Sequence, residues 1–141
     1  MKNGHAIADI LVVDDDPAVQ RMMRRILGRP GYHMLMANGG QDAFDKIADH
    51  LPDLIMLDLS MPMLDGFEVV THLKSSPLTR DIPVILMTGL DSSQNHVRAL
   101  DVGANDFLSK TAEPEEILAR VRSHLKVKQL NDQLSDYQTS L

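Results

Sequence analysis

Five residues with chemically active side chains stand where apolar runs of this chain end: Asp14, Asp15, Asp58, Thr88 and Lys110. Carboxylates gathered within a few ångströms repel one another, which raises their pKa values unless a cation is shared among them. Mg²⁺ takes oxygen ligands and keeps several waters, so a carboxylate site for it stays open to a phosphate oxygen. One such carboxylate can attack phosphorus while a metal ion and an ammonium offset the charge of the transferring group. The residue types therefore predict phosphoryl chemistry on an aspartate.

Each of these residues also has an ordinary structural explanation. Acids after a strand often cap the following helix or face solvent, and Asp16 before Pro17 has the sequence of such a cap. A threonine at a strand end is more often packed than reactive, and a single lysine is more often a surface charge. The functional interpretation rests on convergence, because four separate apolar runs end in groups that suit one chemistry.

The pattern of elements brings these run ends together. Apolar runs alternate with segments of helical period, and this alternation requires helical crossovers between parallel strands. Ligands of such open sheets bind at the carboxyl ends of the strands. The predicted strands are Ile10–Val13, Tyr32–Met36, Leu54–Leu57, Val84–Met87 and Asp106–Ser109. The predicted helices are Pro17–Leu27, Gln41–Asp49, Phe67–Lys74, Ser92–Val102 and one that begins at Glu113–Pro114. We therefore predict a doubly wound α/β fold in three layers.

Composition restricts the class of protein. The chain has 141 residues and 43% hydrophobic side chains, enough for one core but not for two full domains. A net charge of −6 argues against nucleic-acid binding, which needs clustered Lys and Arg. The absence of cysteine excludes disulfides and Cys-ligated zinc. No apolar run is long enough for a signal peptide or a membrane span, so we expect a cytoplasmic protein without membrane contact.

The apolar period changes near Leu125. Val127, Leu130, Leu134, Tyr137 and Leu141 then follow the three-four-three-four spacing of a coiled-coil seam. The alternative is a solvated extension of the last helix. We expect a main domain over residues 1–126 and a helical extension over residues 127–141, which would lead to an output domain absent from this sequence.

Four segments resemble the receiver domains of bacterial two-component response regulators. These are ILVVDDDP, DLIMLDLSMPMLDGFEV, PVILMTG and GANDFLSK, and the resemblance covers about residues 8–126. It implies a flavodoxin-like parallel sheet of strand order 2-1-3-4-5. It also implies that Asp58 accepts a phosphoryl group from a sensor histidine kinase or a phosphotransfer protein. The chain would then be a switch that assists only its own phosphorylation and dephosphorylation, and not an enzyme.

The resemblance further implies a metal site around the phosphoacceptor. Asp14 and Asp15 would hold Mg²⁺ together with Asp58 and the backbone carbonyl of Ser60. Lys110 would pair first with Asp58 and then with its phosphate.

A switch is implied beside this site. Thr88 would bond a phosphoryl oxygen, and Phe107 would be the aromatic switch residue, although by itself it is an ordinary buried ring. The movement of this ring would reshape the face made by the helix at 92–102, the strand at 106–109 and the last helix. A partner or a second copy would bind this face, or the second copy would bind the C-terminal helix.

Two residues depart from the family pattern. Thr111 stands where a proline, joined by a cis bond, usually follows the lysine. A cis bond before a residue other than proline costs about 2.5–4 kcal/mol, which favours a trans bond and makes the approach of Lys110 uncertain. Gly89 replaces the alanine that is common after the threonine, which should open access to the phosphoryl group.

Two other classes of protein share parts of this pattern. A Mg²⁺-dependent phosphohydrolase also uses an aspartyl nucleophile, but it usually needs a second acid two residues later, where this chain has Ser60. A flavodoxin-like cofactor module would share the fold, which does not fix function. Three aspartates after the first strand would repel a flavin phosphate.

Overall fold

Five parallel strands form one sheet in the computed structural model, which describes residues 7–61, 65–89 and 93–140. The strands are β1 (Ala8–Val13), β2 (Tyr32–Ala37), β3 (Leu54–Asp58), β4 (Val84–Thr88) and β5 (Asp106–Ser109). Their order across the sheet is β2-β1-β3-β4-β5, so the strand order implied by the resemblance is confirmed. In the register, Val13 pairs with Leu57 and Thr88 pairs with Ser109. The carboxyl ends of the strands therefore lie at one edge.

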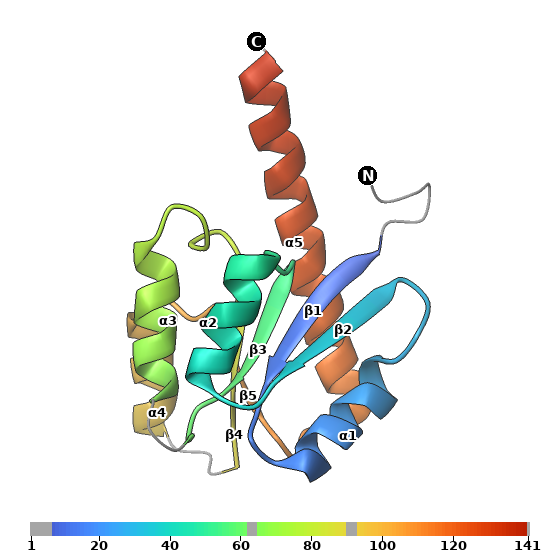
Figure 1. The fold of residues 1–141 in the computed structure, drawn as a ribbon, viewed down its shortest axis with the longest axis vertical. Helices are drawn as coiled ribbons and strands as arrows, with labels where there is room; N and C mark the ends of the chain where they lie inside the picture. Colours follow the sequence, from blue (N-terminus) through green and yellow to red (C-terminus); the bar gives the residue numbers. More distant parts are fainter. Residues whose placement is uncertain (1–6, 62–64, 90–92, 141) are drawn as a thin grey trace.

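Helices cover both faces of the sheet, as the predicted three-layer fold requires (Figure 1). They are α1 (Pro17–Leu27), α2 (Gly40–Asp49), α3 (Gly66–Ser75), α4 (Ser93–Asp101) and α5 (Pro114–Ser140). Successive strand residues face opposite sides. Leu11 and Val13 pack in the core with α2, α3 and α4, whereas Ile10 and Val12 pack in the core with α1 and α5. Both faces of the central strands are buried, which explains their continuous apolar sequence.

The helix ends follow local capping chemistry. The Asp16 side chain accepts a hydrogen bond from the Ala18 backbone N–H at 2.9 Å, so its predicted role as the cap of α1 is confirmed. The predicted start of α3 at Phe67 is one residue late, because the Asp65 side chain caps the helix and Gly66 is its first residue. The predicted start of the fourth helix at Ser92 lies outside the described residues.

The last helix is continuous from Pro114 to Ser140 and extends beyond the body of the fold (Figure 1). Ile117, Val121 and Leu125 are buried against the sheet. The change of apolar period predicted near Leu125 falls where α5 leaves the sheet. The division into two domains at residue 126 stays a prediction.

The described residues include no helix that is both long enough and apolar enough to cross a membrane.

Candidate functional site

Three carboxylates meet at the carboxyl edge of the sheet. Asp14 follows β1, and Asp58 is the last residue of the neighbouring strand β3. Since Val13 pairs with Leu57 in the register, Asp14 and Asp58 lie side by side. The side chains of Asp14 and Asp58 are almost fully buried, with residue exposures of 0% and 3%, whereas Asp15 is exposed. One carboxylate oxygen from each of the three lies within 4.8 Å of the other two. The predicted convergence of these acids is therefore confirmed.

Lys110 reaches the same point from the end of β5. Its Nζ lies 2.9 Å from Asp14 Oδ2 and 3.0 Å from Asp58 Oδ1. The Lys110–Thr111 bond is trans, as we expected without the proline. The Thr111 backbone N–H donates to Ser109 Oγ at 3.1 Å, and this hydrogen bond holds the turn after β5. The replacement of proline therefore does not prevent the lysine from reaching the acids.

The charges at this site are unbalanced. Burial raises the pKa of Asp58 above its ordinary value, and the negative charge of Asp14 raises it further, against the opposing effect of Lys110. Burial lowers the pKa of Lys110, but hydrogen bonds to Asp14 and Asp58 outweigh burial, so this pKa is raised overall. Counted as formal charges, three carboxylates and one ammonium leave two net negative charges. A divalent cation would offset both, and oxygen donors of this kind fit Mg²⁺.

Thr88 and Ser60 border the carboxylates. Thr88 is buried at the end of β4, and its backbone carbonyl accepts a hydrogen bond from the Lys110 N–H at 2.8 Å. The Ser60 backbone N–H donates to Asp58 Oδ1 at 3.2 Å, which holds that oxygen beside the loop. Space is left next to Gly89, because a Cβ built there would meet no described atom within 4 Å. The roles given to the Thr88 hydroxyl and the Ser60 carbonyl remain predictions.

Phe107 lies buried in β5, with 7% of its surface exposed. The ring of His96 in α4 stacks on it, with 5.2 Å between ring centroids and 27° between planes. The Asp106 side chain accepts hydrogen bonds from Arg120 Nη1 at 2.7 Å and from the Phe107 backbone N–H at 2.8 Å, and it lies 2.8 Å from His124 Nε2. Our sequence analysis did not identify His96 or the Asp106 cluster, since helical periodicity predicts a face but not its partner.

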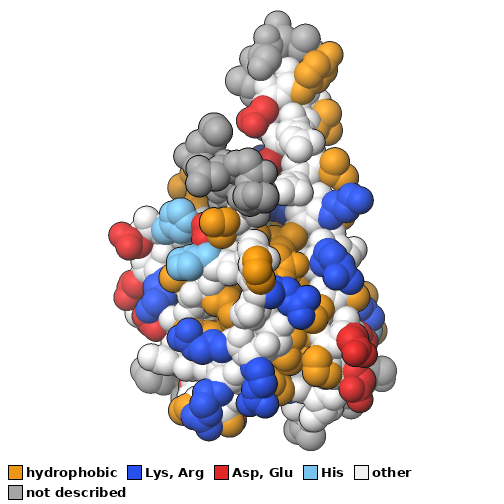
Figure 2. All heavy atoms as spheres, turned by 90° about the vertical axis from the view of Figure 1, so that its right-hand side faces the viewer, with side chains coloured by type: hydrophobic (Ala, Val, Ile, Leu, Met, Phe, Trp, Pro, Cys, Tyr) orange, Lys and Arg blue, Asp and Glu red, His pale blue; other side chains and the backbone are white. Residues whose placement is uncertain are grey.

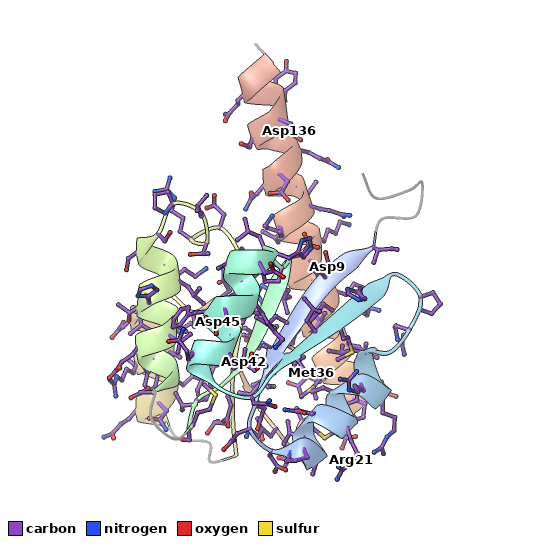
Figure 3. All side chains as sticks on the ribbon, in the orientation of Figure 1. Asp9, Arg21, Met36, Asp42, Asp45 and Asp136 are labelled. Carbon is purple, nitrogen blue, oxygen red and sulfur yellow. The ribbon has the colours of Figure 1, made fainter. Side chains whose placement is uncertain are left out.

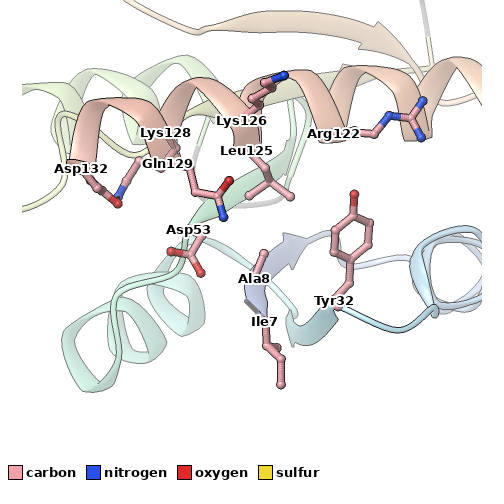
Figure 4. Close-up of a pocket in the computed structure, with 11 residues that line it drawn as sticks. Ile7, Ala8, Tyr32, Asp53, Arg122, Leu125, Lys126, Lys128, Gln129 and Asp132 are labelled. Carbon is pink, nitrogen blue, oxygen red and sulfur yellow. The ribbon is translucent and has the colours of Figure 1, made fainter. Parts of the chain in front are cut away.

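A second group of acids and histidines lies at the opposite edge of the sheet. Asp9, at the start of β1 (Figure 3), lies 3.1 Å from His33 Nδ1 and 2.8 Å from His50 Nε2. Its carboxylate is therefore already shared between two side chains of the same chain. A cavity of about 630 Å³ lies nearby, between α5 and the first residues of β1 and β2 (Figure 4). Neither feature is part of the carboxylate site.

Three comparisons place this geometry among known proteins. The sequence profile of the response regulator receiver domain matches residues 10–122. The response regulator MprA of Mycobacterium sp. (strain KMS) is 45% identical over 117 residues, which are 83% of this chain and 50% of that protein. The chain thus spans about half the length of the curated relatives it matches.

Solved structures show the same fold. A response regulator receiver domain protein (CheY-like) from Methanospirillum hungatei JF-1 matches with a TM-score of 0.81 and 26% identity, over 89% of this chain and 99% of that one. The BeF3-activated N-terminal receiver domain of Klebsiella pneumoniae RstA matches with a TM-score of 0.75 and 35% identity, over 83% of this chain and 97% of that one. The described carboxylate site lies within the matched residues.

Proposed function

Since the chain belongs to the response regulator receiver domain family, in which phosphorylation of an aspartate is general, we propose that Asp58 is its phosphoacceptor. The observation that carries this proposal is the position of Asp58, buried beside two other acids and 3.0 Å from the Lys110 ammonium. The donor is a histidine kinase or a phosphotransfer protein. Transfer breaks the P–N bond of its phosphohistidine and forms a P–O bond to an Asp58 carboxylate oxygen.

The surrounding residues of the chain support this transfer. Asp14, Asp15, Asp58 and the Ser60 carbonyl would hold Mg²⁺, which when bound supplies positive charge to the phosphoryl oxygens. Lys110, whose Nζ lies 3.0 Å from Asp58 Oδ1, would supply the second positive group beside the phosphoryl group.

The Thr88 hydroxyl donates to a phosphoryl oxygen once Asp58 is modified. Thr88 and Phe107 lie on neighbouring strands, since Leu86 pairs with Phe107 and Thr88 pairs with Ser109. We expect a movement of Thr88 to be transmitted across these two strands to Phe107. The new charge on Asp58 thus biases a two-state face formed by α4, β5 and α5.

This face, or the C-terminal half of α5, contacts a partner or a second copy of the chain. Residues 1–126 form the receiver domain and residues 127–141 form the helical extension toward an output domain. We expect a cytoplasmic protein that has no catalytic activity on other molecules. The phosphohydrolase alternative is disfavoured, because Ser60 provides no acid and its N–H is bonded to Asp58.

Mass spectrometry of the intact chain tests the assignment. Incubation with acetyl phosphate and Mg²⁺ should add one phosphoryl group, and Asp58→Asn should abolish this gain. Asp45→Asn is the matched control, because Asp45 is a surface acid of α2 (Figure 3) and should not affect the gain. Equal phosphorylation of Asp58→Asn would contradict the proposal. Repeated turnover of a small phosphate ester by the original chain would instead favour the phosphohydrolase.

A further inference from the structure

The projecting half of α5 presents an apolar stripe that the other described residues leave exposed. Val127, Leu130, Leu134 and Tyr137 are 52%, 54%, 55% and 64% exposed. Hydrophobic side chains follow one edge of this helix in Figure 2. We refer to these four residues as the α5 seam. Apolar side chains at this spacing along a helix are an interaction surface.

The α5 seam points away from the body of the molecule. Leu125, Gln129 and Asp132 line the cavity between α5 and the sheet (Figure 4). With 3.6 residues per turn, Leu130 and Leu134 lie on roughly the opposite side of the helix from those residues. The described residues of the body therefore leave the seam exposed to solvent.

From this placement we infer that the α5 seam binds the same seam of a second copy, as a parallel, in-register, two-stranded coiled coil. This inference names one of the partners left open in the proposed function. The spacing assigns Val127 and Leu134 to heptad position a, and Leu130 and Tyr137 to position d. In the first of these heptads, valine at position a with leucine at position d favours a pair of strands over larger parallel assemblies.

The charges around the seam favour an identical partner. The flanking positions that would face each other across the dimer pair Lys126 with Asn131 and Gln133 with Gln138, so no like charges meet. The charged residues Lys128 and Asp132 lie on the side of the helix away from the seam, where they line the cavity and form an ion pair of 2.6 Å. Lys126 is the single charged residue among these four flanking positions, so a strongly charged partner would find little complementary charge there.

The helix needs no partner in order to form. Its first half is already fixed by the burial of Ile117, Val121 and Leu125, so the costly nucleation of the helix is complete before dimerisation. The described seam covers less than two full heptads, which limits the buried area. We therefore expect a weak dimer, with a dissociation constant of about 10–1000 µM.

Disulfide crosslinking tests the inference, because the chain has no cysteine of its own. Leu130→Cys places a thiol at the centre of the seam, and Asp132→Cys, the matched control, places one on the side of the helix away from the seam. Symmetric d positions in a parallel pair lie within disulfide reach, so Leu130→Cys should crosslink about tenfold faster than Asp132→Cys. Both residues are exposed in the single chain, so neither change affects the core.

A mixture of tagged Val127→Cys and untagged Tyr137→Cys chains fixes the orientation. In a parallel pair each variant crosslinks only with its own kind, whereas an antiparallel pair yields the mixed species. Equal crosslinking rates for Leu130→Cys and Asp132→Cys, or a predominance of the mixed species, would overturn the inference.

Sedimentation of the chain without added cysteine provides a second measurement. Leu134→Asn should weaken self-association about tenfold, and Asp132→Asn should leave it unchanged. If Leu134→Asn and Asp132→Asn weakened self-association equally, this result would also contradict dimerisation through the α5 seam. The crosslinking needs no phosphodonor, so it can be repeated in Asp58→Asn. A failed crosslink would leave the Asp58 assignment intact, and a failed phosphorylation would leave the seam intact.

Discussion

The ionised carboxylate of Asp58 is electrostatically unfavourable in the folded chain when no divalent cation is bound. Its pKa is raised by burial and by Asp14, so its ionised form is less favourable in the folded chain than in the unfolded chain. A carboxyl group with a raised folded pKa costs stability at pH values above that pKa. The cost disappears as the pH falls below the pKa of the unfolded chain.

We therefore predict that Asp58→Asn stabilises the chain in metal-free buffer at pH 7. The gain in the free energy of unfolding should be on the order of 1 kcal/mol, because Lys110 keeps Asp14 as a partner. Urea denaturation in EDTA measures this gain. Added Mg²⁺ should reduce the difference in the free energy of unfolding between the two chains, because it stabilises the original chain more than Asp58→Asn. Asp45→Asn should shift the free energy by less than about 0.5 kcal/mol. A destabilised Asp58→Asn would show that Lys110 outweighs the repulsion among the acids.

Gly66 lies close to the backbone of Asp58 and Leu59, and this close approach is possible because glycine has no side chain. A Cβ at this position would lie 2.8 Å from the Asp58 carbonyl oxygen and 2.8 Å from Leu59 Cα, both backbone atoms that cannot move independently. Gly66→Ala should therefore lower the free energy of unfolding by about 1–3 kcal/mol and weaken Mg²⁺ binding. Gly89→Ala is the control, because its Cβ would meet no described atom within 4 Å. Equal stability of the two variants, measured by thermal unfolding, would contradict this account.

At the scale of elements, Asp106 joins β5 to α5. Its pKa is lowered: hydrogen bonding with His124 and Arg120 outweighs the opposing effect of burial. A carboxyl group with a lowered folded pKa contributes stability above its unfolded pKa, and this contribution is lost as the pH falls through the folded pKa. The stability that the Asp106 carboxylate contributes is therefore complete at neutral pH.

We predict that Asp106→Asn lowers the free energy of unfolding at pH 7 by about 1–3 kcal/mol. The difference from the original chain should shrink below about pH 4, where the carboxyl group of the unfolded chain is protonated. Denaturant unfolding at a series of pH values measures this. Glu116→Gln, whose ion pair with Arg120 is exposed and 3.6 Å long, should change stability little at any pH. A loss of stability in Asp106→Asn that is independent of pH would point to packing instead of charge.

The sequence predicted the strands well because both faces of a parallel sheet are apolar, and that composition is visible in runs such as Leu54–Leu57. It predicted the carboxylate site because parallel strands end at one edge. The stacking of His96 on Phe107 could not be predicted, since it depends on how α4 is rotated against β5. The start of α3 was missed by one residue because the Asp65 cap, not the apolar period, decides where the helix begins.

At the scale of the whole molecule, the candidate site and the projecting helix lie at opposite ends of the sheet (Figure 1). α5 begins four residues after Lys110 and passes the Asp106 cluster before it leaves the body. A rigid helix fixed at one end carries a small rotation there into a larger displacement of its free end. α5 is therefore suited to connect the edge that holds the candidate site to whatever the extension contacts.

This arrangement predicts that the receiver fold does not need the extension. A chain that ends at Gln129 keeps one helical turn after Leu125, the last buried residue of α5 among the described residues, and loses most of the α5 seam. Its free energy of unfolding should stay within about 1 kcal/mol of the full chain, because the deleted side chains that the structure describes are exposed and the Lys128–Asp132 ion pair is open to solvent at Asp132. Its rate of phosphorylation by acetyl phosphate should be unchanged, and it should sediment as a monomer where the 141-residue chain associates. Loss of cooperative unfolding in the shortened chain would mean that the boundary at residue 126 is wrong and that the extension belongs to the domain.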